Sequence, residues 1–194
     1  MLNAILNIGP PILAMDLATR SDPITAFNER AKASGWTFTC GPATGFKHPQ
    51  LVNALAIWRA RANGSAMPSR ADMTARVMKP FIRQMSILER VGAGKAARYR
   101  VRLHGSVLAS YTGDKTGRFL DEVLPVATAC SYAGVYDTAL ELLSPLRLVS
   151  HYQSPKIDYL SGESLVAPLA TSGKGLPLIL SVTYVQPRGN GAVP

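Results

Sequence analysis

Three arginines at alternating positions are the residues of this sequence with the clearest capacity to bind another molecule. Arg98, Arg100 and Arg102 lie within residues 97–123, and apolar side chains stand between them. The intervening residues are Tyr99, Val101 and Leu103. This period of two predicts a β-strand whose arginines, together with His104, point away from a core that the apolar residues face.

The arginine row, Arg98, Arg100 and Arg102, permits two interpretations. Guanidinium groups on one strand face are about 7 Å apart and could dock an anionic partner, such as an acidic helix, a nucleotide phosphate or RNA. Alternatively, the arginines lie on a partly covered sheet face. They would then pair within the chain with Asp114, Asp121 or Glu122.

Residues that commonly perform catalysis or hold cofactors are scattered along the chain. Cys40 and Cys130 lack the neighbouring Cys and His residues of a zinc site, so we expect two free thiols and no metal. Haem needs an axial ligand aimed into a pocket. His48 falls in an N-terminal extension, His104 should point outward and His151 lies near a strand end, which argues against haem.

No sequence motif for catalysis is present. The chain contains no G-x-S-x-G nucleophile motif, no phosphate-binding loop with the Walker lysine and no paired carboxylates. Gly113 and Gly117 are better explained as turn residues. We therefore predict a protein that is not an enzyme.

The composition indicates a globular protein with a basic bias. At 194 residues and 47% hydrophobic content, the chain suits one domain with extensions. The formal net charge is +9, and the segment from Trp58 to Arg102 holds eleven Lys or Arg residues against two acids. Such a segment attracts acidic partners, but it has few aromatic residues for base stacking, which argues against nucleic-acid binding.

The apolar N-terminus resembles neither a signal peptide nor a membrane span. It lacks a positively charged start, and Pro10, Pro11 and Asp16 interrupt it. We expect a cytoplasmic protein without a membrane span. Residues 1–49, rich in turn formers, are predicted as an extension that is partly disordered or docks on the domain, with one short helix over residues 24–34.

Periodicity predicts the elements of the remaining chain. Helices are expected after Gln50, where Trp58 should pack on the core, after a Ser69–Asp72 capping box, and through residues 120–143. Strands are expected before Gly92, over 99–103, and over 146–153, 163–171 and 176–186, with a Gly173–Gly175 hairpin turn between the last two. The domain should span residues 50–186, followed by a disordered tail over 187–194.

Five short motifs give the sequence a family resemblance. They are Trp58-Arg59, Pro68 to Asp72, Tyr99 to Gly105, Asp114 to Arg118 and Glu163 to Leu169. In this order and at these spacings, the chain resembles a group of bacterial PAS-like proteins over residues 50–185. Many members of that group stand alone.

The resemblance implies a fold and a place for a ligand. The fold is α+β, with a five-stranded antiparallel sheet, helices on one face and an N-terminal helical extension. The segments that would cover the sheet supply the pocket candidates Tyr111, Phe119, Leu120, Tyr132 and Tyr136. An apolar cavity with tyrosine hydroxyls could hold a small aromatic or acyl molecule; alternatively, these side chains fill the core.

The resemblance also implies a sensory or regulatory role. We expect a ligand-binding or partner-binding PAS protein that signals through a protein partner, as a homodimer. Thr116 to Leu120 lacks the cysteine of the flavin photosensors, which argues against flavin. The alternative is a ligand-free dimerisation or interaction adaptor that docks an acidic partner through the arginine row.

Overall fold

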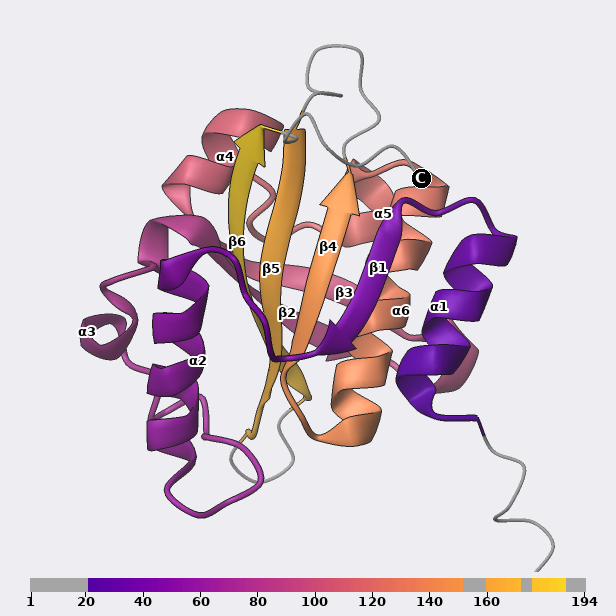
Figure 1. The fold of residues 1–194 in the computed structure, drawn as a ribbon. Helices are drawn as coiled ribbons and strands as arrows, with labels where there is room; N and C mark the ends of the chain where they lie inside the picture. Colours follow the sequence, from indigo (N-terminus) through magenta and orange to yellow (C-terminus); the bar gives the residue numbers. More distant parts are fainter. Residues whose placement is uncertain (1–20, 152–159, 172–175, 188–194) are drawn as a thin grey trace, which may run out of the picture.

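A single antiparallel sheet organises the protein, whose computed structural model describes residues 21–151, 160–171 and 176–187. The strands are β1 (Phe38–Pro42), β2 (Met85–Val91), β3 (Arg98–His104), β4 (Leu146–His151), β5 (Leu160–Leu169) and β6 (Leu178–Pro187). Their order across the sheet is β1-β4-β5-β6-β2-β3 (Figure 1). The fold is α+β, as predicted from the sequence. The predictions for residues 1–20, for the 173–175 turn and for the tail after residue 187 fall on residues that are not described.

The sheet has six strands, so the prediction of five is corrected. The additional strand, β1, lies within the predicted extension and pairs with β4 from Phe38↔Ser150 to Pro42↔Leu146. Its five residues end in Gly41-Pro42, a pair that resembles a turn in sequence. An edge strand tolerates this proline because one side of its backbone needs no partner.

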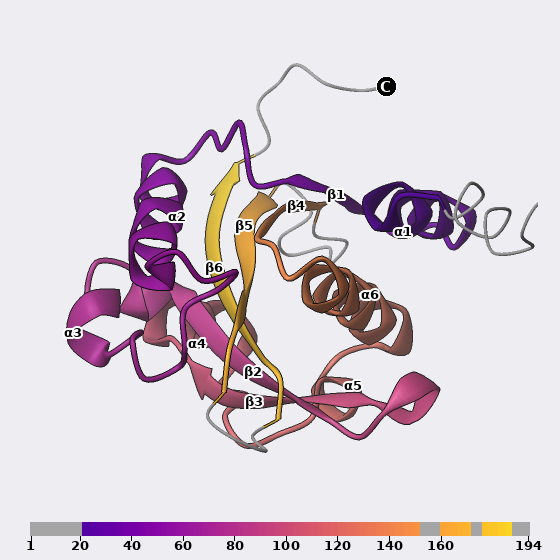
Figure 2. The same ribbon diagram turned by 90° about the horizontal axis from the view of Figure 1, so that it is seen from below.

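Helices cover both faces of the sheet, which corrects the prediction that they cover one. The helices are α1 (Pro23–Ala33), α2 (Pro49–Ala62), α3 (Ala75–Met78), α4 (Ser106–Thr112), α5 (Leu120–Val123) and α6 (Val126–Leu142). Figure 2 shows α2 and α3 on one side of the sheet and α6 on the other. Both faces need cover because β5 is buried at every residue from Gly162 to Leu169, so consecutive side chains point to opposite cores.

Side-chain caps mark the starts of α1 and α3. Asp22 caps α1 by accepting a hydrogen bond from the Thr25 backbone N–H at 3.0 Å. Ser69 and Asp72 do form reciprocal hydrogen bonds, but they close a turn rather than start a helix. The next helix, α3, begins later, after the cap Thr74.

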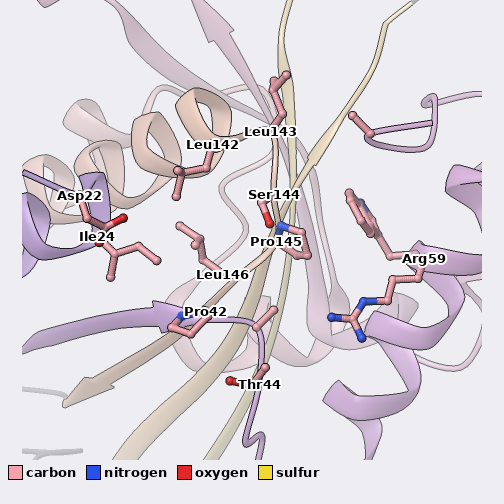
Figure 3. A pocket seen from close by; sticks show the side chains of 13 residues that line it. Asp22, Ile24, Pro42, Thr44, Arg59, Leu142, Leu143, Ser144, Pro145 and Leu146 are labelled. Atoms are coloured by element: carbon pink, nitrogen blue, oxygen red, sulfur yellow. The ribbon is translucent and has the colours of Figure 1, made fainter. Parts of the chain in front are cut away.

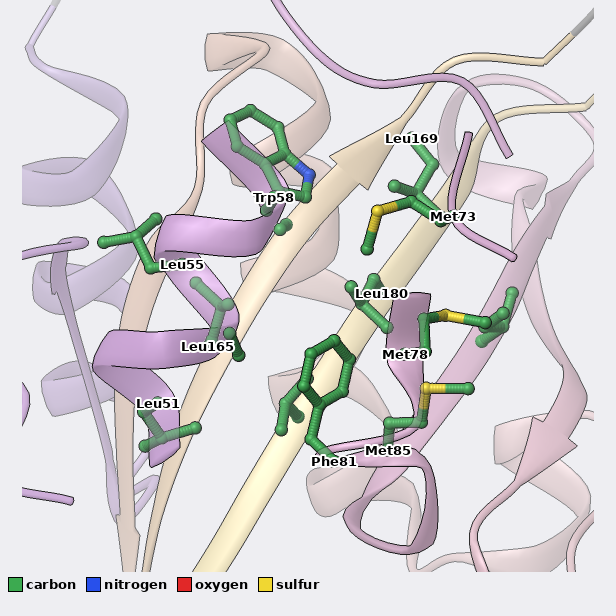
Figure 4. Packing of buried hydrophobic residues seen from close by; sticks show 14 of the residues in the cluster. Leu51, Leu55, Trp58, Met73, Met78, Phe81, Met85, Leu165, Leu169 and Leu180 are labelled. Atoms are coloured by element: carbon green, nitrogen blue, oxygen red, sulfur yellow. The ribbon is translucent and has the colours of Figure 1, made fainter. Parts of the chain in front are cut away.

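The core on the α2 face is filled by large apolar side chains. Leucines of α2 and the fully buried Phe81 pack against Leu165 and Leu180 of the sheet, with Met73, Met78 and Met85 between them (Figure 4). Trp58 joins this core, as predicted, and its indole N–H donates to the Pro168 carbonyl at 3.0 Å. On this face, no buried side-chain nitrogen or oxygen atom of the described residues lacks a hydrogen bond.

A buried carboxylate fastens the start of α2 to the sheet. Glu163 of β5 is 3% exposed and accepts hydrogen bonds from the backbone N–H groups of Lys47 and His48, at 3.0 and 2.9 Å. Arg147 of β4 donates to the same carboxylate at 2.6 Å. The His48 ring stacks on Tyr184 with centroids 3.8 Å apart. Glu163 therefore links three segments that are distant in sequence.

A β-bulge in β3 changes the direction of its last side chains. Leu88 pairs with Val101 and Ile87 pairs with Leu103, so Arg102 is an extra residue without an opposite partner. Tyr99 and Val101 consequently belong to the α6-side core, whereas Leu103 packs against the α2-side core. The prediction that these three share one face is therefore wrong at Leu103.

Other parts of the chain hydrogen-bond to both edges of the sheet. At β3, the Val101 N–H donates to the Arg118 carbonyl at 2.9 Å and the Val101 carbonyl accepts from the Gly117 N–H at 2.7 Å. At β1, the Asn28 side chain of α1 donates to the Cys40 carbonyl at 2.8 Å and accepts from its N–H at 2.9 Å. The Asp114–Arg118 turn and α1 thus cover the two edge strands.

Candidate ligand cavity

A cavity of about 590 Å³ lies on the α6 face of the sheet. Its floor consists of side chains from β2, β3, β4 and β6. Its walls come from α4 and the turn after it, α5, α6 and the start of β1. The apolar lining residues are Phe38, Leu88, Val101, Leu108, Leu120, Leu124, Pro125 and Ala127. The volume is within the range of sites for small molecules.

Small hydroxyl side chains make the floor of the cavity polar. They project from neighbouring strands as Ser86, Ser150, Ser181 and Thr183. Ser86 pairs directly with His104 on one side and with Ser181 on the other, so these three form a row across β3, β2 and β6. The hydroxyl of Thr183 is already hydrogen-bonded to Ser164 at 2.8 Å. The small side chains of Ser86 and Ser181 leave space above this part of the sheet.

The bulge directs His104 into the cavity, which corrects the prediction that His104 points outward with the arginines. Its Nδ1 lies 2.9 Å from Ser86 Oγ, and its Nε2 lies 3.3 Å from Thr112 Oγ1. Because the Thr112 hydroxyl donates to the Leu108 carbonyl, it accepts from Nε2–H, and Nδ1 then accepts from Ser86. Burial, assisted by the charge of Lys115, lowers the His104 pKa, so the ring is neutral near pH 7.

Lys115 lines the cavity next to this histidine. Its ammonium group donates to the Thr112 carbonyl. Burial lowers the pKa of Lys115, while the nearby charge of Asp114 acts in the opposite direction. Asp114 itself accepts hydrogen bonds from the Thr116 N–H and hydroxyl, at 2.9 and 2.7 Å. The cavity therefore has a cationic group at its α4 end.

Two tyrosines of α6 form part of the opposite wall. The rings of Tyr132 and Tyr136 stack with centroids 5.9 Å apart, and Phe38 contacts Tyr132 edge-on at 4.8 Å. Burial raises the pKa of Tyr136, although a hydrogen bond with the Ser181 side chain opposes the shift. The Tyr136 hydroxyl therefore stays protonated.

The structure brings together three of the five predicted pocket residues. Leu120, Tyr132 and Tyr136 line the cavity. Tyr111 does not, because it is 56% exposed on α4. Phe119 lies outside the cavity beneath Arg98, whose guanidinium carbon is 3.9 Å from the ring centroid.

The three arginines of the row all form ion pairs within the chain. Arg98 donates to Asp121 at 2.8 Å and to Glu122 at 3.1 Å, in agreement with the predicted internal pairing. Arg100 and Arg102 share a different acid, Glu89, at 2.6 and 3.3 Å. Asp114, the third predicted acid, caps its own turn instead.

Sequence reasoning missed the polar floor and the contribution of β1. Serine and threonine at inward positions of otherwise apolar strands are the signal that could have located Ser86, Ser181 and Thr183. No comparable signal pointed to Phe38, because β1 was not expected as a strand. His104 was missed because one extra residue in β3 reverses the direction of its side chain.

A second pocket, of about 450 Å³, lies between the start of α1, the end of α2 and the start of β4 (Figure 3). Arg59 extends into it from α2, and Asp22 lies on its far side. Loops and helix ends contribute most of its other lining, including Ser144 and Pro145. The strand faces do not form its floor, so the first cavity is the better candidate site.

Fold and cavity together define an α+β domain with space for a ligand between sheet and helices. A family model of the PAS domain matches residues 46–182, well over half of the chain. The chain therefore belongs to the PAS domain family, whose members generally have sensory or regulatory roles and commonly mediate protein interaction and dimerisation. No curated protein and no solved structure matches it.

Neither a membrane span nor a metal site is found among the described residues. None of their helices is both long and apolar enough to cross a membrane. Among the same residues, no group of three or more His, Cys, Asp or Glu side chains is placed to hold a metal ion.

Proposed function

We propose that this protein is a sensory PAS protein that binds a small ligand in the cavity of about 590 Å³ and signals its occupancy to a protein partner. The cavity is the observation that carries the proposal. A module that acts only by docking has no need of open space in its core, and interiors are otherwise close-packed. The lining combines a largely apolar wall with a few polar groups, which suits binding rather than catalysis.

Helix α5 offers a route from the cavity to the surface. Leu120 at its start lines the cavity, while the next two residues, Asp121 and Glu122, pair with Arg98 on the outside. A ligand that binds one position of Leu120 better than another shifts the equilibrium between them, and the ion pairs of Arg98 shift with it. We propose that the partner recognises this change in the arginine row.

The second candidate function is a ligand-free adaptor, which docks an acidic partner through the same arginines. One observation favours it: Arg100 and Arg102 share the single carboxylate of Glu89, so one positive charge is left uncompensated. Arg102 is also 54% exposed at the bulge. Under this alternative the cavity would remain empty in the working protein.

Native mass spectrometry of the purified protein distinguishes the two functions. We expect the wild-type protein to carry a co-purified small molecule and the Val101→Phe variant, whose larger side chain projects into the cavity, to lack it. Val182→Phe places the same change on the α2 face and should retain the ligand. An empty wild-type dimer that still binds an acidic partner would instead support the adaptor.

A further inference from the structure

The described residues that line the cavity carry one charge, and it is positive. Among the lining residues that the structure describes there is no Asp or Glu, and Lys115 is the one lysine or arginine. Desolvating this ammonium costs free energy, which a bound negative charge would offset. The lining thus favours an anion over a cation.

No acid of the described residues forms an ion pair with Lys115, although the nearby charge of Asp114 partly offsets the effect of burial on its pKa. Its neighbour Asp114 directs Oδ1 to the Thr116 N–H and hydroxyl, and the ammonium contacts a neutral carbonyl, that of Thr112. Close to it, His104 Nε2–H makes only a long bond of 3.3 Å to Thr112 Oγ1. The ammonium has two further N–H donors, and the imidazole would give up only a long bond, so both groups can donate to a ligand.

Three of the four hydroxyl groups on the cavity floor are already hydrogen-bonded within the protein, Ser150 being the fourth. The Ser86, Ser181 and Thr183 hydroxyls are already bonded to His104, Tyr136 and Ser164 respectively. No buried side-chain nitrogen or oxygen of the described residues lacks a partner. A sugar or a nucleotide, with many polar groups, would bury them without partners, which is costly.

From this arrangement we infer that the cavity binds a monocarboxylate with an apolar body. The carboxylate is held by Lys115 and His104 Nε2–H at the α4 end, and the body packs against Leu88, Val101 and Leu120. A single cation suits a single negative charge, whereas a phosphate monoester would bring a second charge without a partner. The inference rests on the proposed function, since it names the ligand class of the same cavity.

Calorimetric titration with three probes of equal chain length tests the ligand class. The probes are decanoate, decanol and decylamine, which share one apolar body and differ in head group. Decanoate should bind at least about tenfold more tightly than decanol, because hydrogen bonds to charged groups contribute more than neutral ones. Decylamine should bind most weakly, since its charge repels Lys115.

Two lysine variants locate the contact. Lys115→Gln should weaken decanoate about tenfold and leave decanol unchanged. Lys79→Gln removes the same charge from an exposed position that does not line the cavity, and it should change neither affinity. Val101→Phe should abolish binding of both decanoate and decanol.

The inference is overturned if decanol matches decanoate, if Lys115→Gln binds decanoate as tightly as the wild type, or if none of the probes binds the wild-type protein. A different observation, the presence of a co-purified molecule, tests the proposed function. A co-purified molecule that is lost in Val101→Phe would preserve it even when the carboxylate class is wrong. An empty wild-type protein together with three inactive probes would remove both.

Discussion

The two faces of the sheet are built from the same strands but with different side chains. On the α2 face, β6 presents Leu178, Leu180 and Val182 to a filled core of leucine, methionine and aromatic residues. On the α6 face, the same strand presents Ile179 and then Ser181 and Thr183, and a cavity lies above them. Alternate residues of one strand thus serve different purposes.

This difference shows how a single sheet can separate stability from binding. Large side chains on the α2 face leave little space and contribute most through close packing. Small hydroxyl side chains on the other face contribute less to stability but leave space for a ligand. Substitutions on the two faces should therefore have different consequences even when their chemistry is identical.

The largest expected effect is the loss of a leucine from the filled face. Leu165→Ala should lower the free energy of unfolding by about 4 kcal/mol, because neighbouring side chains cannot relax into the space. Leu88→Ala, the matched change at the cavity floor, should cost about 2 kcal/mol, since Leu88 already borders open volume. Urea unfolding measures both values. Equal losses would contradict the proposed contrast between the faces.

Glu163→Gln should be nearly as damaging, at about 3 kcal/mol, because it leaves Arg147 without the buried carboxylate. Glu29→Gln on the surface of α1 is the control and should have almost no effect.

The stability of the protein should also depend on pH through Glu163. Burial raises the pKa of Glu163, but the Lys47 and His48 N–H groups and Arg147 outweigh it, so the pKa lies below its usual value of 4.5. A carboxyl with a lowered pKa stabilises the fold above pH 4.5, and this stability is lost as the pH falls through the folded-state pKa. Glu163→Gln should therefore lose less stability on acidification than wild type. If the variant and the wild type lost the same stability on acidification, Glu163 would not be the group that titrates.

Enlarging a side chain should destabilise the protein more on the filled α2 face than at the cavity. Val182→Phe overfills the α2-side core and should cost about 2 kcal/mol, whereas Val101→Phe extends into existing space and should cost less than about 1 kcal/mol. Thermal unfolding of the two variants gives the comparison. A Val101→Phe protein as unstable as Val182→Phe would indicate that the cavity is closed in solution.

The smallest expected effect is the contribution of His104 protonation to stability. Burial, then the charge of Lys115, lowers the His104 pKa below its usual 6.5, although Asp114 opposes this. A histidine with a lowered pKa stabilises the fold above pH 6.5, and this contribution is lost as the pH falls through the folded-state pKa. Proton NMR should show a His104 midpoint below 6.5, assigned through His104→Gln. A midpoint above 6.5 would refute the neutral ring.

The sequence predicted the elements with clear periodicity and missed those that depend on a single residue. The alternation at Tyr99 and Val101 identified β3, and helical spacing identified α2 around Trp58. The bulge at Arg102 leaves no trace in composition, so the directions of Leu103 and His104 were predicted wrongly.

The cavity was predicted only in part for a similar reason. Leu120, Tyr132 and Tyr136 lie on segments that cover the sheet, and their apolar character was sufficient to select them. Tyr111 has the same character but lies on the exposed side of its helix. Which side of a short helix faces the sheet depends on tertiary packing, which about two helical turns of sequence do not encode.

The hydrogen bonds at the two edges of the sheet restrict the ways in which a partner can bind this protein. An uncovered edge strand offers its backbone to any extended peptide, and it is the usual starting point for both strand exchange and fibril growth. Here Gly117 and Arg118 occupy the backbone of Val101 at one border, and Asn28 occupies that of Cys40 at the other. These hydrogen bonds interrupt each edge near its middle, so we expect the folded chain to add a strand less readily than a sheet with open edges.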